Sequence, residues 1–138
     1  MSVNFYDAAL DPLVNYNNTK AQLITAIKAK TYRAGGTYTG RALKSAADNI
    51  LKSNLGDGVN KILIVITDGQ SYDQVVTSAK YAVENKITVI AVGVGPGVND
   101  TQMLEIAQSP TNVIKVSSFV ELTKLAKYIG NFLCKQVI

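Results

Sequence analysis

The clearest pattern in the chain is a continuous hydrophobic run at Ile62–Ile66. Its residues are mostly β-branched and no polar residue interrupts them, which is typical of a strand buried on both faces of a sheet. Ile87–Val94 has the same character. The segment between the two runs is long enough for a crossover helix. The two runs therefore predict parallel strands joined by a helix.

Weaker strand patterns lie at Val3–Asp7 and Val113–Val116, and a brief one at Leu13–Val14 follows the turn residues Asp11 and Pro12. Helices are predicted where apolar residues recur at helical spacing. They are a helix capped by Thr19 that runs to about Lys30, and helices at Arg41–Lys52, Asp73–Asn85, Thr101–Gln108 and Ser118 to about Lys135.

Strands that alternate with helices of this length form parallel βαβ units. We therefore expect one α/β domain over residues 1–138, with a doubly wound, mostly parallel sheet and flanking helices. In such sheets, binding sites lie at the carboxyl ends of the strands. The loops that matter are then Arg33–Gly40, Thr67–Asp73 and Gly93–Asp100.

Composition narrows the function. The chain has no histidine, so it cannot hold a Ser–His or Cys–His nucleophile. It has a single cysteine, Cys134, so it cannot form an internal disulfide. Its net charge is +4, but the lysines are scattered rather than gathered into the basic stripe of a nucleic-acid reader. No hydrophobic run approaches the about 18 residues of a membrane span.

Two loops carry candidate chemistry. Asp68 follows the buried strand, where a carboxylate binds a cation or else caps the amides of the turn or of the next helix. Gly35–Gly40 offers threonine hydroxyls near a helix start, and hard cations such as Mg²⁺ prefer such oxygen ligands. A phosphate-binding loop would need Lys and Ser or Thr after its last glycine, whereas Arg41 and Ala42 follow here. Gly93–Gly97 is better interpreted as a turn.

Several segments, in order, resemble the von Willebrand factor A (VWA) domain. The strongest matches are "ILIVITDGQS" (Ile62–Ser71), "ITVIAVGVG" (Ile87–Gly95) and "GGTYTGRAL" (Gly35–Leu43). Weaker matches precede and follow them at "VNFYDAA", "YNNTKAQLITAI", "MLEIAQSP" and "SFVELTKLAKYIGNFLC". The resemblance spans nearly the whole chain, and its combination of motifs is specific although each motif alone is not.

The resemblance implies a non-enzymatic adhesion module of an extracellular or matrix protein. It further implies a metal-ion-dependent adhesion site for Mg²⁺, or for Mn²⁺ or Ca²⁺, with Thr37 and Asp68 as metal ligands. An acidic residue of a bound protein commonly completes the coordination in this family. Tyr38, Gln70 and Ser71 would flank the site without an assigned role.

The chain departs from the family in one respect. The first strand, the first helix and the Asp-x-Ser-x-Ser loop between them have no counterpart, so we expect a gap between the strands at Val3–Asp7 and Ile62–Thr67. Unpaired strand edges are rarely left exposed. Three explanations stay open: a longer parent chain, a second polypeptide that supplies the strand, or edges that rearrange and pair with each other or with another copy. Cys134 fits the first two, because many family members bridge a cysteine here to one before the missing strand.

Three other functions remain as alternatives. The domain could serve in assembly without metal, it could be an intracellular VWA module, or it could be a nucleotide-binding α/β enzyme. The enzyme alternative is disfavoured by the missing histidine and by the absence of a phosphate-loop lysine.

Overall fold

The computed structural model describes residues 3–6, 10–14, 19–31, 34–53, 56, 58–122 and 124–125. The elements, in order, are β1 (Val3–Tyr6), β2 (Leu10–Val14), α1 (Lys20–Lys28), α2 (Thr39–Lys52), β3 (Lys61–Thr67), α3 (Val76–Glu84), β4 (Ile87–Val94), α4 (Asp100–Ala107), the 3-10 helix Pro110–Asn112 and β5 (Val113–Val116). Residues 119–122 and 124–125 are also helical. Cys134 and the rest of the predicted last helix lie outside the described residues.

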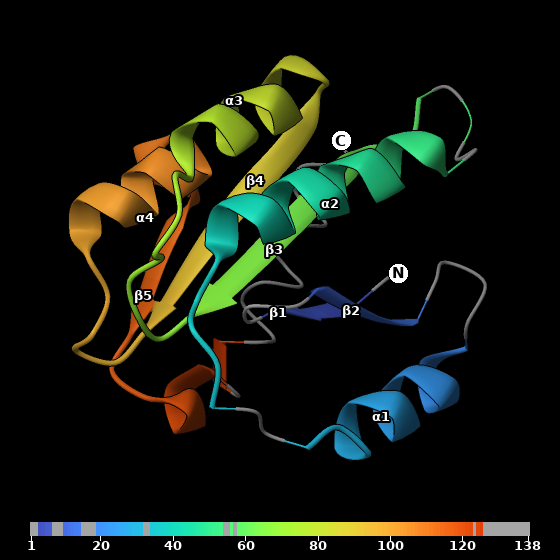
Figure 1. Ribbon diagram of the computed structural model, residues 1–138, viewed down its shortest axis with the longest axis horizontal. Coiled ribbons are helices and arrows are strands. Elements are labelled where there is room, and N and C mark those ends of the chain that lie inside the picture. The colour runs from blue at the N-terminus through green and yellow to red at the C-terminus, as the bar shows by residue number, and fades with distance from the viewer. Residues whose placement is uncertain are drawn as a thin grey trace.

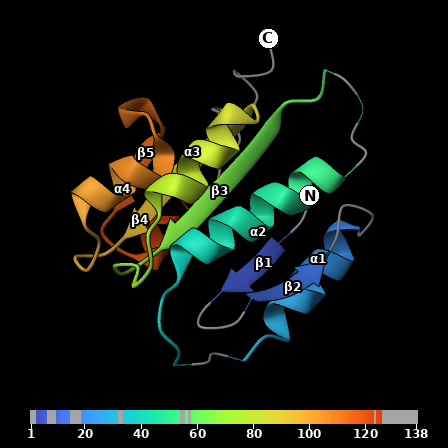
Figure 2. The same ribbon diagram turned by 45° about the horizontal axis from the view of Figure 1, so that its top comes forward.

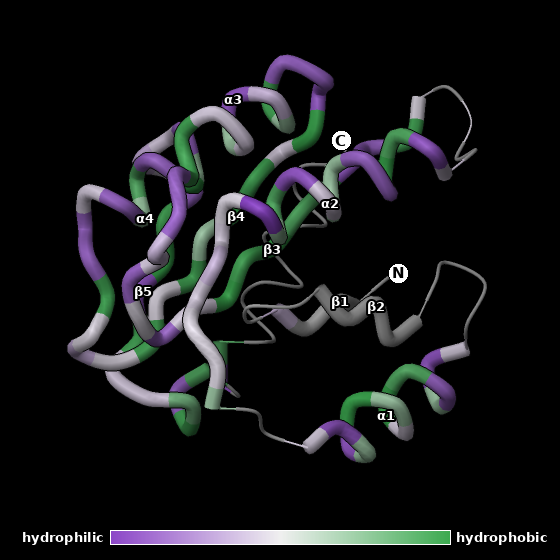
Figure 3. Tube along the Cα trace, in the orientation of Figure 1, coloured by the Kyte–Doolittle hydropathy of each residue, from purple (hydrophilic) through white to green (hydrophobic). Residues whose placement is uncertain are grey.

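The parallel α/β fold is confirmed. Strands β3, β4 and β5 form a parallel sheet in that order, and Lys61–Thr67 pairs residue by residue with Ile87–Gly93. Helices α2, α3 and α4 lie along one face of this sheet (Figure 1). Strands β3 and β4 are hydrophobic along most of their length (Figure 3). The described helices include none long and apolar enough to cross a membrane.

The core lies between these three helices and the sheet. It contains small and branched side chains that allow close packing, among them Leu43, Ala47, Ala79, Val89 and Ile106. On the opposite face of β4, Ile90 and Val92 are fully buried as well. The continuous hydrophobic run of β4 is thus explained by burial on both faces, as its sequence predicts.

Strands β1 and β2 form a separate antiparallel hairpin. Within the described residues β1 does not pair with β3, so the sheet is split where the sequence predicts a gap. Helix α2 contacts both β1 and β3, and the hairpin lies between α2 and α1 (Figures 1 and 2). On β3, Ile64 and Ile66 are 36% and 45% exposed, so this strand is less buried than its composition predicts.

Two predicted boundaries are wrong for physical reasons. Asp11 and Pro12 were expected in a turn but belong to β2, because a two-stranded hairpin tolerates a proline where no second neighbour needs its N–H. The third helix was expected to begin at Asp73 but begins at Val76. The Asp73 side chain binds another helix instead, as described below.

The turn from α3 into β4 contains a strained residue. Lys86 is exposed and has a φ of 60°, in the left-handed region that disfavours a side chain with a Cβ atom. We expect Lys86→Gly to raise the free energy of unfolding by about 0.5–1 kcal/mol, measured by urea denaturation. The control, Lys80→Gly in the regular part of α3, should lower it by about 1 kcal/mol. A loss of stability in both variants would contradict this interpretation.

Candidate functional site

Three loops meet at the carboxyl ends of β3 and β4. The loop before α2 is joined to the loop after β3 by a hydrogen bond from the Tyr72 amide to the Thr37 carbonyl, at 2.8 Å. The loop after β3 is joined to α4, because the Ser71 amide donates to Oε1 of Gln102 at 2.7 Å. The structure therefore brings together the loops in which the sequence predicts a site.

Asp73 caps helix α2 from a distant part of the chain. Its two carboxylate oxygens accept hydrogen bonds from the amides of Gly40 and Arg41, each at 2.8 Å. Those amides belong to the first turn of α2, whose own N-cap residue, Tyr38, makes no side-chain capping bond. The first amides of a helix have no partner within it, so Asp73 supplies the missing acceptors. The negative charge is also favoured at this end of the helix dipole.

The close approach of these segments requires a glycine. A Cβ atom on Gly40 would lie 2.0 Å from the carbonyl oxygen of Gln74, closer than any real contact. Only a residue without a side chain therefore lets the first turn of α2 pack against the loop that carries Asp73. This gives Gly40 a packing role besides the turn-forming role expected from the sequence.

Ser71 connects the same elements. Its hydroxyl accepts a hydrogen bond from the Thr39 amide at 2.8 Å and donates one to Oδ1 of Asp73 at 2.6 Å. Its amide binds Gln102, which lies in the first turn of α4. Ser71 thus holds α2, the loop after β3 and α4 in one hydrogen-bonded unit, a role that its position beside Asp68 does not reveal.

The charge of Asp73 is stabilised by these bonds. Burial opposes ionisation, but hydrogen bonds from the Ser71 hydroxyl and from the amides of Gly40 and Arg41 outweigh it. Together they hold the pKa of Asp73 below the usual value of an aspartate. Asp73 is therefore an anion, and both of its carboxylate oxygens accept hydrogen bonds within the fold.

Tyr6 brings the hairpin to the site. Its phenol oxygen lies 3.5 Å from the hydroxyl of Thr39, which is fully buried at the start of α2. Burial raises the pKa of the Tyr6 phenol. Hydrogen bonds with Thr39 and Thr67 lower this pKa, whereas the negative charges of Asp68 and Asp73 raise it. Because burial is the largest effect, the pKa of Tyr6 lies above its usual value. The phenol is therefore a neutral group between β1, α2 and the end of β3.

Thr37 and Asp68 lie in the two loops joined by the Tyr72–Thr37 hydrogen bond. Thr37 is half-buried and Asp68 is exposed. The loop after β4 packs closely against Asp68, since a Cβ atom on Gly97 would lie 2.7 Å from the Asp68 carbonyl oxygen. Gly97 thus allows the loop after β4 to pack against the backbone of Asp68.

The side-chain oxygens of Thr37 and Asp68 are the kind of ligand that binds a hard cation, but these are only two side chains. A hydroxyl and a carboxylate are ligands that Mg²⁺ accepts. Among the described residues, however, no group of three or more His, Cys, Asp or Glu side chains could hold a metal ion. Asp73 is close to this edge, but its oxygens already accept hydrogen bonds from Gly40, Arg41 and Ser71. Within the described residues, the two side chains predicted as ligands, Thr37 and Asp68, therefore do not form a complete coordination shell.

The family follows from comparison with known proteins. A model of the von Willebrand factor type A domain matches residues 5–127. The chain belongs to the von Willebrand factor type A domain family. This VWA domain is 32% identical over 129 residues to the human collagen alpha-1(XXI) chain, covering 92% of the domain and 13% of the collagen. It is 33% identical over 121 residues to human matrilin-1, covering 85% of the domain and 24% of matrilin-1.

A solved structure agrees with this assignment. Proximal thread matrix protein 1 from the mussel byssus, with a zinc-occupied MIDAS motif, has a TM-score of 0.81 and 29% sequence identity to the VWA domain. The match covers 93% of the domain and 34% of the byssus protein. The domain thus corresponds to about a third or less of each of these relatives.

Removing the Asp73 cap should weaken the VWA domain. We expect Asp73→Ala to lower the free energy of unfolding by about 1–2 kcal/mol, because two amides of α2 lose their acceptor. The measurement is urea denaturation, with Glu84→Ala as a control that removes an exposed carboxylate from α3. The control should change stability by less than about 0.5 kcal/mol. Equal effects of the two substitutions would show that the cap contributes nothing.

The low pKa of Asp73 also predicts a dependence on pH. A carboxyl group whose pKa is lower in the folded than in the unfolded state stabilises the fold above its unfolded pKa, and this contribution disappears as the pH falls through the folded pKa. We expect the stability difference between the wild type and Asp73→Asn to be constant near neutral pH and to shrink in acid. Denaturation curves between pH 7 and about pH 2 test this. A difference that stays constant over the whole range would contradict it.

Proposed function

We propose that this VWA domain is a protein-binding module of an extracellular matrix protein, and that it binds its partner at the carboxyl edge of the sheet. The observation that carries the proposal is the hydrogen-bonded unit of Asp73, Ser71 and Gln102, which joins α2 and α4 to the loop that carries the exposed Asp68. A surface whose loops are held in place loses little entropy on binding. An exposed carboxylate on such a surface is available to a ligand.

The relatives support the location. They include collagen chains, matrilin-1 and a byssus thread matrix protein, all proteins of extracellular matrices. We infer that the parent protein acts outside the cell and that this domain contributes adhesion rather than catalysis. The chain has no histidine, so it holds neither a Ser–His nor a Cys–His pair.

Thr37 and Asp68 are the residues that we propose as ligands of a divalent cation, Mg²⁺ or else Mn²⁺ or Ca²⁺. When bound, such a cation attracts a carboxylate of the partner protein and so links the two surfaces. The byssus protein, whose metal-ion-dependent adhesion site (MIDAS) motif holds zinc, supports the binding of a divalent metal by this domain. With only two side-chain ligands from the described chain, we expect weak binding of the metal.

Adhesion should depend on Asp68. We expect the wild-type domain to bind a surface coated with a solubilised extracellular-matrix preparation, and Asp68→Ala to bind at least about tenfold more weakly. The control is Asp100→Ala, which removes another exposed carboxylate, one paired with Lys115. Surface plasmon resonance in Mg²⁺ gives the affinities. Equal binding by the wild type and Asp68→Ala would contradict the placement of the partner.

The metal is measured separately on the same variants. Titration with Mn²⁺, followed by electron paramagnetic resonance, should show weak binding with a Kd of about 10⁻⁴–10⁻³ M that Asp68→Ala abolishes and Asp100→Ala leaves unchanged. Tight Mn²⁺ binding that survives Asp68→Ala would place the metal elsewhere. If adhesion depends on Asp68 but no Mn²⁺ binds, the proposed binding site for the partner protein stands and the proposed metal site is wrong.

A further inference from the structure

Two tyrosines and an arginine form a cluster beside the loops of the site, in which Tyr72 and Arg41 are exposed and Tyr38 is half-buried. The rings of Tyr38 and Tyr72 lie with their centroids 5.9 Å apart and their planes tilted by 43°. The guanidinium carbon of Arg41 lies 5.1 Å from the centroid of the Tyr38 ring, within the range of a cation–π interaction. Tyr72 is 78% exposed, the highest value among the exposed large hydrophobic side chains. We call these three residues the tyrosine rim.

The backbone beneath the tyrosine rim is fixed. The Tyr72 amide donates to the Thr37 carbonyl at 2.8 Å, and the Arg41 amide donates to Asp73 at 2.8 Å. Gly36 packs beside both rings, since a Cβ atom there would lie 3.1–3.2 Å from atoms of Tyr38 and Tyr72. The tyrosine rim is therefore organised before any partner arrives, and binding would cost little conformational entropy.

The exposed Tyr72 ring is unexplained by the stability of the fold, because a side chain that keeps most of its surface in water contributes little to the core. Tyrosine and arginine are instead the residues that most often dominate the energy of protein interfaces. Their apolar rings and polar tips suit a surface that is wet when free and covered when bound. The tyrosine rim thus has the composition and exposure of a binding surface.

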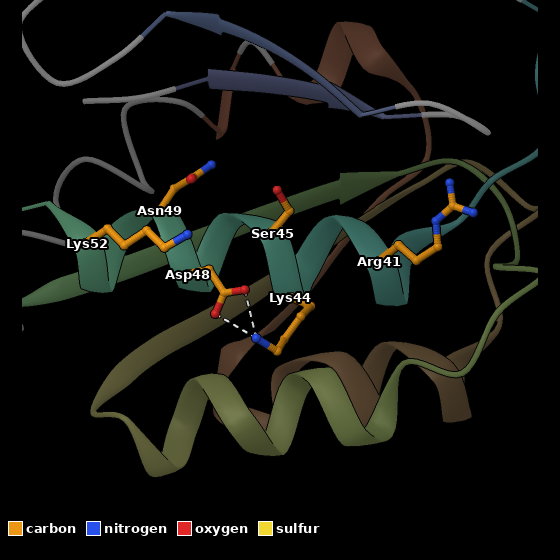
Figure 4. Close-up of a pocket in the computed structure, with 6 residues that line it drawn as sticks. All are labelled: Arg41, Lys44, Ser45, Asp48, Asn49 and Lys52. Carbon is orange, nitrogen blue, oxygen red and sulfur yellow. Dashed lines mark hydrogen bonds and ion pairs between the residues drawn. The ribbon is translucent and has the colours of Figure 1, made fainter.

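The neighbouring charges indicate the chemistry of the partner. Arg41, Lys44 and Lys52 line a shallow hollow of about 340 Å³ along α2, so the hollow shares Arg41 with the tyrosine rim (Figure 4). Within it, Lys44 pairs with Asp48 at 2.6 Å and lies over the Tyr81 ring. Arg41 lies at the end of the hollow nearest the rings, and its planar guanidinium suits a carboxylate.

We propose that the tyrosine rim binds an extended acidic segment of the partner protein, with a carboxylate on Arg41 and an adjoining proline on the rings of Tyr38 and Tyr72. Exposed aromatic rings bind extended proline-containing segments well because such segments are already ordered when free. This inference rests on the proposed function, since it concerns the same edge of the domain. It differs in that the contact is direct and needs no metal.

The test uses a fluorescent peptide of alternating proline and glutamate, with a peptide of alternating proline and lysine for comparison, in buffer with EDTA. We expect fluorescence anisotropy to show binding of the acidic peptide alone. Tyr72→Ala and Arg41→Ala should each weaken it by about tenfold or more. Tyr72→Phe should retain most of the binding, because it keeps the ring. Lys52→Ala is the matched control for Arg41→Ala, with the same charge change at the other end of α2, and should have a smaller effect.

Several outcomes would overturn the proposal: no binding of the acidic peptide by the wild type, equal binding of both peptides, or affinities that Tyr72→Ala and Arg41→Ala leave unchanged. Loss of binding that is the same in Lys52→Ala as in Arg41→Ala would also overturn it, because attraction by net charge would then suffice. Asp68→Ala separates this inference from the proposed function. In EDTA it should not weaken peptide binding, so that the outcomes for the tyrosine rim and for the Asp68-dependent adhesion are independent.

Discussion

The hydrogen bonds accepted by the Asp73 carboxylate are the interaction on which the carboxyl edge of this domain depends. It joins the loop after β3 to the first turn of α2, more than 30 residues away in the sequence, through the amides of Gly40 and Arg41. A helix start needs acceptors for its first amides, and α2 lacks a capping side chain of its own. One side chain therefore accepts hydrogen bonds from the first amides of α2 and also sets the spacing between the loops that carry Thr37 and Asp68.

That spacing does not rely on a continuous sheet. Within the described residues the β1–β2 hairpin and the β3–β4–β5 sheet are separate, and no ladder of backbone hydrogen bonds joins β1 to β3. The hairpin is instead placed by packing against α2 and by the Tyr6 phenol, which reaches the Thr39 hydroxyl. The loops at the carboxyl edge adjoin α2, β3 and α4, and hydrogen bonds of Asp73, Ser71 and the Tyr72 amide join them to one another. These bonds do not involve β1 or β2, so the order of this edge does not require a continuous sheet.

The sequence predicted the elements better than their connections. The continuous hydrophobic run of β4 identifies a strand that is buried on both faces, and that of β3 identifies a strand although Ile64 and Ile66 are partly exposed. Thr19 caps α1 as its sequence predicts. The resemblance of Gly35–Leu43 and Ile62–Ser71 to known motifs pointed to two loops that the structure brings together. The roles of Asp73 and Gln102 could not be predicted, because each side chain accepts a hydrogen bond from a residue about 30 positions away. The spacing of hydrophobic residues along the chain does not show which distant residues meet. Asp73 looked like the first residue of a helix, and only the fold shows that it caps a different one.

The tyrosine rim follows from the same constraint. Because Asp73 holds the Arg41 amide and Thr37 holds the Tyr72 amide, the two segments cannot separate without breaking both hydrogen bonds. Their side chains are consequently fixed relative to each other at the surface, and Gly36 leaves space for the rings to approach. A loop that only connected two elements would not need this degree of order around an exposed ring. The hydrogen bonds that place Thr37 beside the Asp68 loop therefore also order the tyrosine rim, which lies along the same edge of the domain.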